Sequence, residues 1–490
     1  MRALFERRFL GVRVVLVLCT SLLVSGLIHQ SVCARASFDL VGSASETGAV
    51  RQQQETPKIA VNDASVSHDR VLGDASVSTP ESIGTMQLDV RARIHAKSIL
   101  LLAPIEPLSR ELSAVLQVLQ KDLAFSDQFE VRVKPIKTMQ HVQELQDLRA
   151  QGYALVLFFT QPTPDTIEWR LYDVTQSLMV QGKKYTKRGA YLAGWAHNLA
   201  DGIWPALTGQ GVFFSTKIAY CKEVHMRKKK KISHMYVADY DGSNEQLLMN
   251  TPTVIVAPRW NNAAKQPLLF YSEYTNANVR LMVTDMHKHA KIASNFDGVN
   301  MVPTFSKDGK QVVYCASRGD GSCHLYQYAN GICKRITRNR GNNVSPTFAD
   351  DNTTIYFCSD FQTELPQIFS YNLQTQALER ITQGGYCACP NYHAQRGLVY
   401  AKRADGYMQL FTYDPKTKQH RQVTHDAGDK DEPSWSPCGN CVLFSSERHG
   451  KNRIALLNML TNERRYLTPE KENCSYPAWS PIYDQVPVIL

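Results

Sequence analysis

The segment Pro303–Thr337 reads PTFSKDGKQVVYCASRGDGSCHLYQYANGICKRIT and has the features of a small antiparallel sheet. It begins with Pro-x-aromatic-Ser, turns at Asp308-Gly309, and continues through two alternating apolar runs separated by the Gly-rich turn Gly319–Gly321. Apolar residues that recur with period two, divided by Asp-Gly or Gly turns, predict short strands joined by hairpins. One such sheet cannot bury both of its faces, so we expect it to pack against similar neighbours.

Similar segments follow one another along the C-terminal half of the chain. Prolines of the Pro-x-aromatic motif recur at intervals of 43 to 45 residues, in Pro258-Arg259-Trp260, Pro303-Thr304-Phe305, Pro346-Thr347-Phe348, Pro390-Asn391-Tyr392, Pro433-Ser434-Trp435 and Pro477-Ala478-Trp479. A steady period of this size, with about four short strands per unit, is typical of β-propeller blades. The repeats have no 3.6-residue apolar stripe, which excludes a helical solenoid.

The two ends of the repeat array are incomplete in a complementary way. The first unit, from about Val212, lacks the Pro-x-aromatic strand, and the last unit consists only of that strand, Cys474–Pro481. We therefore predict that residues 474–481 complete the first blade and close a six-bladed propeller, which would leave no open sheet edge.

The N-terminus has the pattern of an export signal. Four arginines precede the apolar run Val14–Leu27, and small-residue cleavage sites follow at residues 32–36. A membrane anchor is the alternative, but the run is shorter than the ~20 residues that a spanning helix needs. We expect a signal peptide at 1–36 and an exported protein that does not itself span the membrane. We expect no nucleic-acid partner, because the net charge of +10 is mild for 490 residues.

Two further segments separate the signal from the propeller. Residues 37–86 are rich in Ser, Asp, Gln and Thr, so we expect a flexible arm, either a passive linker or a tail that folds onto a partner. Residues 87–209 predict a small α/β domain, with a buried strand at Ser98–Pro104, a helix capped by Ser109 and a closing helix over Arg188–Leu207 that ends at Gly209. The propeller then occupies residues 210–490.

This organisation resembles the TolB family of the Tol–Pal system. The most specific similarities are the segments Leu207-Thr208-Gly209, Thr216–Tyr220, Val237–Gly242 and Pro477–Pro481. The resemblance implies a monomeric, non-enzymatic periplasmic hub without a cofactor, released by cleavage near residues 34–36. It also implies binding of a Pal-like peptidoglycan-associated lipoprotein at the propeller mouth and of inner-membrane Tol proteins through the N-terminal region, in support of outer-membrane integrity and cell division. The arm 37–86 is longer than the family's N-terminus, which leaves its role open.

The loops that precede each Pro-x-aromatic strand are expected to surround the mouth of the channel. Asn300 and Asn343 lie three residues before Pro303 and Pro346, as in the family pattern. The candidate partner contacts are Asn300, Met301, Asn343, Val344, Asp431 and Glu432. The alternative for each polar residue is that it caps its own loop.

Three other features of the repeats have ordinary explanations. The six repeat aromatics could form a carbohydrate-stacking ladder, but their period is that of the fold and favours packing between blades. The ten propeller cysteines could be free thiols or local disulfides. Cys387-x-Cys389 and Cys438-x-x-Cys441 could together bind zinc. Because no histidine accompanies them at finger spacing, we expect no metal site. The run Arg227–Lys231 is expected to be a solvated loop tip.

Alternative functions belong to other classes of exported propeller. Propellers of this repeat type also occur beside serine peptidase domains, but such a domain needs a Gly-x-Ser-x-Gly motif, which is absent from the sequence. The chain could then be a non-catalytic relative of those peptidases, or a propeller that binds peptidoglycan or another glycan.

Overall fold

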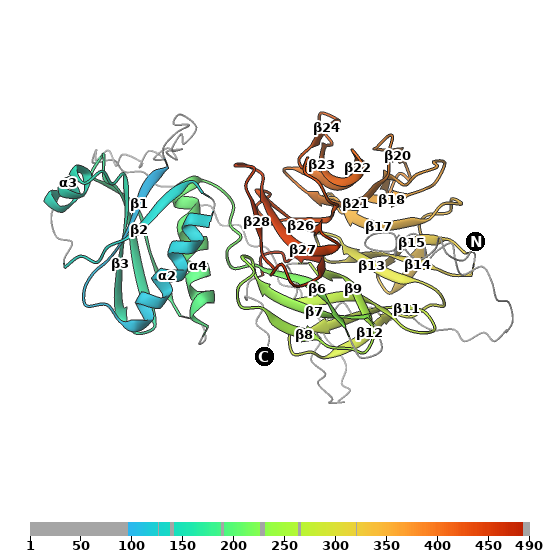
Figure 1. The fold of residues 1–490 in the computed structure, drawn as a ribbon, viewed down its shortest axis with the longest axis horizontal. Helices are drawn as coiled ribbons and strands as arrows, with labels where there is room; N and C mark the ends of the chain where they lie inside the picture. The colour runs from blue at the N-terminus through green and yellow to red at the C-terminus, as the bar shows by residue number, and fades with distance from the viewer. Residues whose placement is uncertain are drawn as a thin grey trace, which may run out of the picture.

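The computed structural model describes residues 97–483 except 126, 138–141, 188–190, 226–230, 263–265 and 320. The predicted signal peptide, the predicted arm and most of the basic run Arg227–Lys231 lie outside these residues. The described chain forms two lobes, an N-terminal α/β domain and a β-propeller (Figure 1). Within the described residues, no helix combines the length and the hydrophobicity needed to cross a membrane.

The N-terminal domain is built on a five-stranded mixed sheet of order β2-β1-β3-β4-β5, in which β1 is parallel to β2 and β3 and the remaining pairs are antiparallel. Its elements are β1 (Ser98–Pro104), α2 (Arg110–Phe125), β2 (Phe129–Val133), α3 (Val142–Ala150), β3 (Leu155–Thr163), β4 (Thr166–Asp173), β5 (Leu178–Thr186) and α4 (Leu192–Thr208). Helices α2 and α4 cover the side of the sheet that faces the propeller (Figure 1).

Two local predictions for this domain are confirmed. The hydroxyl of Ser109 accepts a hydrogen bond from the backbone N–H of Leu112 (2.9 Å), which caps the N-terminus of α2. Gly209 has φ 67° and donates its N–H to the carbonyl of Pro205 (2.8 Å), so it ends α4 in the left-handed conformation that favours glycine.

The propeller consists of six four-stranded antiparallel sheets, as predicted. Blade 1 contains β29 (Cys474–Trp479), β6 (Lys217–His225), β7 (Lys231–Asp239) and β8 (Gln246–Met249). Blade 2 contains β9 (Val254–Trp260), β10 (Leu268–Tyr274), β11 (Val279–Asp285) and β12 (Ala290–Ser294). Blade 3 contains β13 (Asn300–Phe305), β14 (Gln311–Ser317), β15 (Cys323–Ala329) and β16 (Ile332–Arg335).

The remaining blades follow the same order from the inner to the outer strand. Blade 4 contains β17 (Asn343–Phe348), β18 (Thr354–Ser359), β19 (Gln367–Asn372) and β20 (Leu378–Arg380). Blade 5 contains β21 (Cys387–His393), β22 (Gly397–Ala404), β23 (Tyr407–Asp414) and β24 (Gln419–Gln422). Blade 6 contains β25 (Lys430–Trp435), β26 (Cys441–Arg448), β27 (Lys451–Asn458) and β28 (Arg464–Tyr466).

The C-terminal strand closes the ring by pairing with the first strand of the propeller. Strand β29 runs antiparallel to β6, with Cys474 opposite Lys222 and Trp479 opposite Ile218. The backbone N–H of Ser480 donates to the carbonyl of Lys217 (2.8 Å) and extends the pairing by one more bond. The prediction that residues 474–481 complete the first blade is confirmed.

The inner strands share a bulge at the residue before the motif proline. This residue has a positive φ between 47° and 59° in every blade, at Ala257, Val302, Ser345, Cys389, Glu432 and Tyr476. The ladder between inner and second strand shifts register at this position. Because non-glycine residues rarely adopt this conformation, and least of all β-branched residues such as Val302, we attribute it to the fold, which imposes the same bend on all six inner strands.

The residue after the proline joins neighbouring blades. In four blades its side chain accepts the backbone N–H of the motif aromatic in the next blade, over 2.8 to 3.3 Å, in the pairs Thr304–Phe348, Thr347–Tyr392, Asn391–Trp435 and Ser434–Trp479. The aromatic rings themselves are buried or half-buried between blades, which agrees with the packing role expected for them.

Candidate functional site

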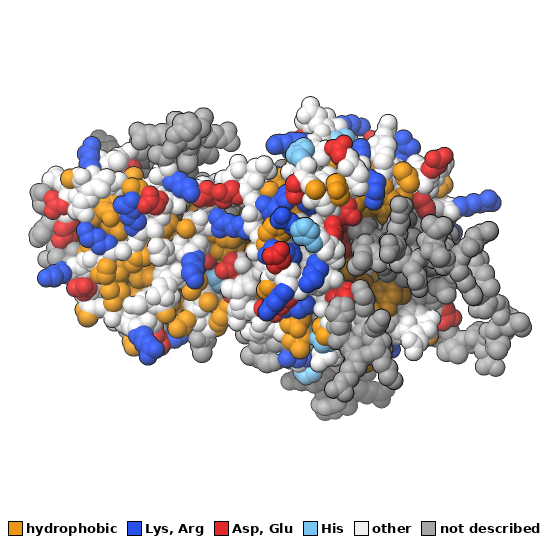
Figure 2. All heavy atoms as spheres, in the orientation of Figure 1, with side chains coloured by type: hydrophobic (Ala, Val, Ile, Leu, Met, Phe, Trp, Pro, Cys, Tyr) orange, Lys and Arg blue, Asp and Glu red, His pale blue; other side chains and the backbone are white. Residues whose placement is uncertain are grey.

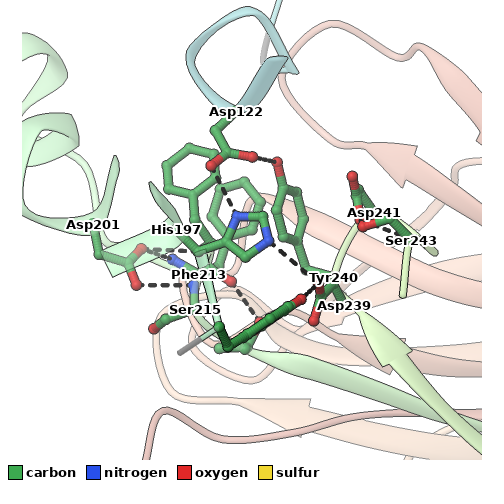
Figure 3. A network of polar contacts seen from close by, with 12 residues as sticks. Asp122, His197, Asp201, Phe213, Ser215, Asp239, Tyr240, Asp241 and Ser243 are labelled. Atoms are coloured by element: carbon green, nitrogen blue, oxygen red, sulfur yellow. Dashed lines mark hydrogen bonds and ion pairs between the residues drawn. The ribbon is translucent and has the colours of Figure 1, made fainter. Parts of the chain in front are cut away.

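The junction between the two domains is a buried ionic network. His197, from α4, lies between two carboxylates, with its Nδ1 2.8 Å from Asp122 Oδ2 and its Nε2 3.4 Å from Asp239 Oδ2 (Figure 3). Asp122 belongs to α2, whereas Asp239 ends β7 of blade 1, so the imidazole connects the N-terminal domain to the propeller. The hydroxyl of Tyr240 donates to the other oxygen of Asp122 (2.8 Å) and makes a second connection across the junction.

Two carboxylates and two cations meet in this network, in which burial raises the pKa of Asp122 and its contact with His197 opposes the rise. Lys217 forms an ion pair with Asp239, and the hydroxyl of Tyr191 donates to the same carboxylate. Burial alone lowers the pKa of His197, but its hydrogen bonds to Asp122 and Asp239 and their negative charges outweigh this effect and raise the pKa to about 10. Burial also opposes ionisation of Asp239, yet His197 and Lys217 keep the pKa of Asp239 below its ordinary value. The imidazole is therefore cationic at neutral pH and donates from both nitrogens.

Asp201 fixes the segment that links the two domains. Its carboxylate accepts three successive backbone N–H groups, from Phe213 (3.1 Å), Phe214 (2.8 Å) and Ser215 (3.0 Å). Phe213 and Phe214 pack edge-to-face against Tyr240, with ring centroids 5.3 and 5.4 Å apart. Because the N-terminal core and residues of blades 1 and 6 form one continuous hydrophobic cluster, the two lobes are packed together rather than loosely tethered.

The N-terminal domain contacts the end of the propeller opposite the mouth loops. The guanidinium of Arg465 lies 4.7 Å from the ring of Phe125 in α2, and Asn440 donates to Gln210 (3.1 Å), in the segment that follows the domain. Asn440 follows the inner strand of blade 6, whereas the mouth loops precede the inner strands. These contacts are thus made on the other face of the ring from the mouth.

Asn300 and Asn343 are the first residues of β13 and β17, at the ends of the mouth loops, and both side chains are fully buried. The amide of Asn300 donates to the carbonyls of Val279 (3.0 Å) and Phe296 (2.7 Å), and its oxygen accepts from Ser294 (2.9 Å). The amide of Asn343 donates to the carbonyls of Cys323 (3.2 Å) and Gly341 (2.8 Å). Both asparagines therefore hold their loops in shape, which is the alternative considered for them from the sequence.

The other four candidates line the same region of the inner strands. Met301 and Val344 are buried in one hydrophobic cluster that spans blades 2 to 5. Asp431 accepts the backbone N–H of Glu432 (2.7 Å), and burial raises the pKa of Asp431 above its usual range. Glu432 accepts from the hydroxyl of Ser445 (2.7 Å) and from the backbone N–H of Tyr476 (2.7 Å), and so ties blade 6 to blade 1 inside the ring. Direct partner contact by these six residues stays a prediction.

Lys430, which was not among the candidates predicted from the sequence, caps the corresponding loop of blade 6. Like Asn300 and Asn343, it lies three residues before the motif proline. Its buried ammonium donates to the carbonyls of Asp426 (3.0 Å), Ala427 (2.6 Å) and Gly428 (2.8 Å). The shared offset from Pro433 was the signal that could have revealed it.

The channel holds a cavity of about 620 Å³ lined by the inner strands of all six blades.

The ten cysteines from Cys221 to Cys474 are all free thiols. In the part of the chain that the structure describes, no group of three or more His, Cys, Asp or Glu side chains has the arrangement of a metal site.

A closed six-bladed propeller fixed to a small α/β domain defines the fold class of the protein. Residues 204–483, more than half of the chain, match the family model described as the TolB beta propeller domain. The chain belongs to this TolB propeller family.

Individual relatives agree with this assignment. A Tol-Pal system protein TolB of Gluconobacter oxydans is 30% identical over 177 residues, which cover 36% of this chain and 38% of that protein. A Tol-Pal system protein TolB of Francisella tularensis is 26% identical over 303 residues, covering 60% of this chain and 59% of the relative. The chain thus matches less than two thirds of the length of these curated relatives. The crystal structure of TolB from Acinetobacter baumannii shares the fold, with a TM-score of 0.68 at 23% identity over 79% of this chain and 97% of that one.

Proposed function

We propose that the protein is a non-enzymatic interaction hub of the Tol–Pal type, exported to the periplasm and cleaved near residues 34–36. It binds a peptidoglycan-associated lipoprotein at the propeller mouth and inner-membrane Tol proteins through its N-terminal region. In this way it maintains outer-membrane integrity and supports envelope constriction during cell division. The observation that carries the proposal is the match of residues 204–483 to the TolB propeller family.

The architecture supports two separate partner-binding regions, one at each end of the molecule. The N-terminal domain, which we propose extends over 87–209, contacts the face of the ring opposite the mouth through its described residues, so one partner can bind at the mouth while another engages the N-terminal region. The propeller, which we propose extends over 210–490 with 474–481 closing it, is held as a ring in part by the bonds that join the inner strands of blades 3, 4, 5, 6 and 1 in succession. We propose that the protein acts as a monomer.

The mouth is suited to a protein partner because its loops are fixed before binding. Buried caps at Asn300, Asn343 and Lys430 set the backbone of three loops, so little conformational entropy is lost when a partner docks. We propose that Asn300, Met301, Asn343, Val344, Asp431 and Glu432 shape this surface from within. Exposed residues of the same loops, such as Arg338 and Arg340, make the outer contacts.

The test is binding of the full chain to the soluble domain of the peptidoglycan-associated lipoprotein of the same organism, measured by isothermal titration calorimetry. The double substitution Arg338→Glu and Arg340→Glu reverses charge on the loop that Asn343 caps and should weaken binding at least tenfold. Lys334→Glu, which reverses one charge on the exposed outer strand β16, is the matched control for Arg338→Glu and Arg340→Glu when each is made singly. Absence of binding by the unmodified chain would overturn the proposal, and binding of peptidoglycan fragments without the lipoprotein would favour a glycan-binding propeller instead.

A further inference from the structure

A second cavity of the propeller lies in the groove between blades 4 and 5, away from the channel. It has a volume of about 420 Å³. Its walls come from β20 and the residues that follow it, on blade 4, and from β22, β23 and the β23–β24 hairpin on blade 5. Lys, Arg and His side chains gather over this part of the molecule, at the top of the propeller in Figure 2.

One wall of the cavity is a fixed pair of rings. His420 stacks on Tyr413, with ring centroids 4.7 Å apart and planes inclined by 29°. The hydroxyl of Tyr400, which is 1% exposed, lies 2.9 Å from His420 Nδ1. Because a buried phenol and a parallel ring both hold the imidazole, its position on the wall does not depend on a ligand.

The cavity carries more positive than negative charge. Arg380, Lys402 and Lys418 line it, against the single carboxylate of Glu379. Glu379 lies 3.1 Å from the ammonium of Lys418 and neutralises it across the groove. In contrast, the ammonium of Lys402 donates to the carbonyl of Gln383 (3.1 Å), and among the described residues neither Lys402 nor Arg380 has a carboxylate within ion-pair distance.

The electrostatics of His420 reflect this excess of positive charge. Burial and the nearby ammonium of Lys402 lower the pKa of His420, while a hydrogen bond to the backbone of Ile381 opposes the shift. The charged and titratable groups that face the ring are Lys402 and Tyr400 on β22, Tyr413 on β23, Lys418 on its own hairpin, and Glu379 and Arg380 on β20. An anion beside Lys402 would remove this repulsion.

We propose that the groove between blades 4 and 5 is a binding site for a small organic anion, a carboxylate or phosphate carried on a group of about monosaccharide size. Arg380 and Lys402 bind the negative group, and the Tyr413–His420 pair forms the wall against which the remainder packs. A volume of 420 Å³ is within the usual range for small-molecule sites. The site is separate from the mouth, so the inference does not depend on the proposed function.

The experiment measures binding of glucuronate, inorganic phosphate and uncharged glucose to the full chain by isothermal titration calorimetry at low ionic strength. Saturable binding of either anion, and none of glucose, supports the site, and the tighter of the two anions identifies the natural group as a carboxylated or a phosphorylated compound. Arg380→Gln and Lys402→Gln should each weaken binding at least fivefold. Lys416→Gln is the matched control, because Lys416 is exposed on the same hairpin and does not line the cavity.

A second measurement separates a specific site from general attraction to a basic surface. Nuclear magnetic resonance of the His420 ring should show its pKa rise when the anion saturates the protein, whereas the ring signals of His449, on another blade, should not move on addition of the anion at constant pH. Failure of both anions to saturate below about 10 mM would overturn the proposal, since weaker binding is not expected to be specific. Equal loss of affinity in Lys416→Gln and Arg380→Gln would overturn it as well.

Discussion

The indole N–H of Trp479 donates a hydrogen bond to the hydroxyl of Thr216 over 2.7 Å. Trp479 ends the last strand of the ring, and Thr216 immediately precedes its first strand. The bond therefore joins the two ends of the propeller at the point where the N-terminal domain is attached. The closure of the ring and the junction of the two domains share one buried cluster.

Trp479→Phe should destabilise the protein more than Trp435→Phe does. The two tryptophans occupy the same repeat position and are both 6% exposed, but the indole nitrogen of Trp435 has no hydrogen-bond partner in the described structure. The substitutions thus remove the same volume, and only the first breaks a hydrogen bond, which is worth about 1 kcal/mol. Urea denaturation of both variants measures the difference. Equal midpoints would show that the Trp479–Thr216 bond contributes nothing to closure.

Removal of residues 469–490 should abolish the single cooperative unfolding transition of the propeller. Without β29, blade 1 loses its inner strand and β6 becomes an open edge beside blade 6. Thermal unfolding followed by circular dichroism and analytical ultracentrifugation would detect the broadened transition and the resulting association. A monomer with an unchanged melting curve would contradict the closure that β29 provides.

His197→Gln should destabilise the domain junction more at pH 6 than at pH 9. The pKa of His197 is raised from 6.5 to about 10, so the stability contributed by its charge is fully present below pH 6.5 and is lost as the pH rises toward 10. The lowered pKa of Asp239 contributes stability that is lost only in acid, below the range compared. The gap between wild type and variant should shrink with pH, by at most about 1.4 kcal/mol per pH unit. Urea denaturation at both pH values measures it, and a gap independent of pH would show that the pKa of His197 is the same in the folded and unfolded chain.

Asn343→Ala should lower the stability of the mouth even though no partner is present. The substitution removes the amide that donates to the buried carbonyls of Cys323 and Gly341, at a cost of about 1–3 kcal/mol. Gln374→Ala, on the exposed β19–β20 hairpin of the same blade, is the control and should change stability by less than about 0.5 kcal/mol. Differential scanning calorimetry compares the two. An unchanged melting temperature in Asn343→Ala would contradict the loop-capping role and favour direct partner contact for this residue.

The sequence predicted the propeller well because each blade repeats the same local pattern. The motif prolines marked all six inner strands, and the missing strand at one end matched the extra strand at the other.

The N-terminal domain was harder to predict from the sequence. Strand β5 is an edge strand with most of its side chains exposed on both faces, so it lacks the alternation that identifies a half-buried strand. Strand β2 and helix α3 are short and were not predicted.

The junction network could not be predicted from spacing, because its members are distant in the sequence. Asp122 and His197 are 75 residues apart, and His197 and Asp239 are 42 apart. Only the packing of α2, α4 and blade 1 brings them together. The sole sequence signal was the segment Val237–Gly242, whose similarity to the TolB family includes Asp239 and Tyr240. For Asn300 and Asn343 the repeat pattern indicated a place just before the motif strands but could not distinguish a side chain that faces a partner from one that turns inward.

Asp201→Asn should loosen the segment between the domains while leaving each domain folded. An aspartate accepts all three N–H groups of residues 213–215 with two oxygens, whereas the amide offers one oxygen and places an N–H₂ group against a backbone donor. We expect a loss of about 1–3 kcal/mol and faster proteolytic cleavage between residues 209 and 216. Asp165→Asn, in the exposed β3–β4 turn, is the matched control and should be cleaved at the wild-type rate. If Asp201→Asn resists cleavage as well as the control, the aromatic packing of Phe213 and Phe214 against Tyr240 alone holds the domains together, and the carboxylate is dispensable for the junction.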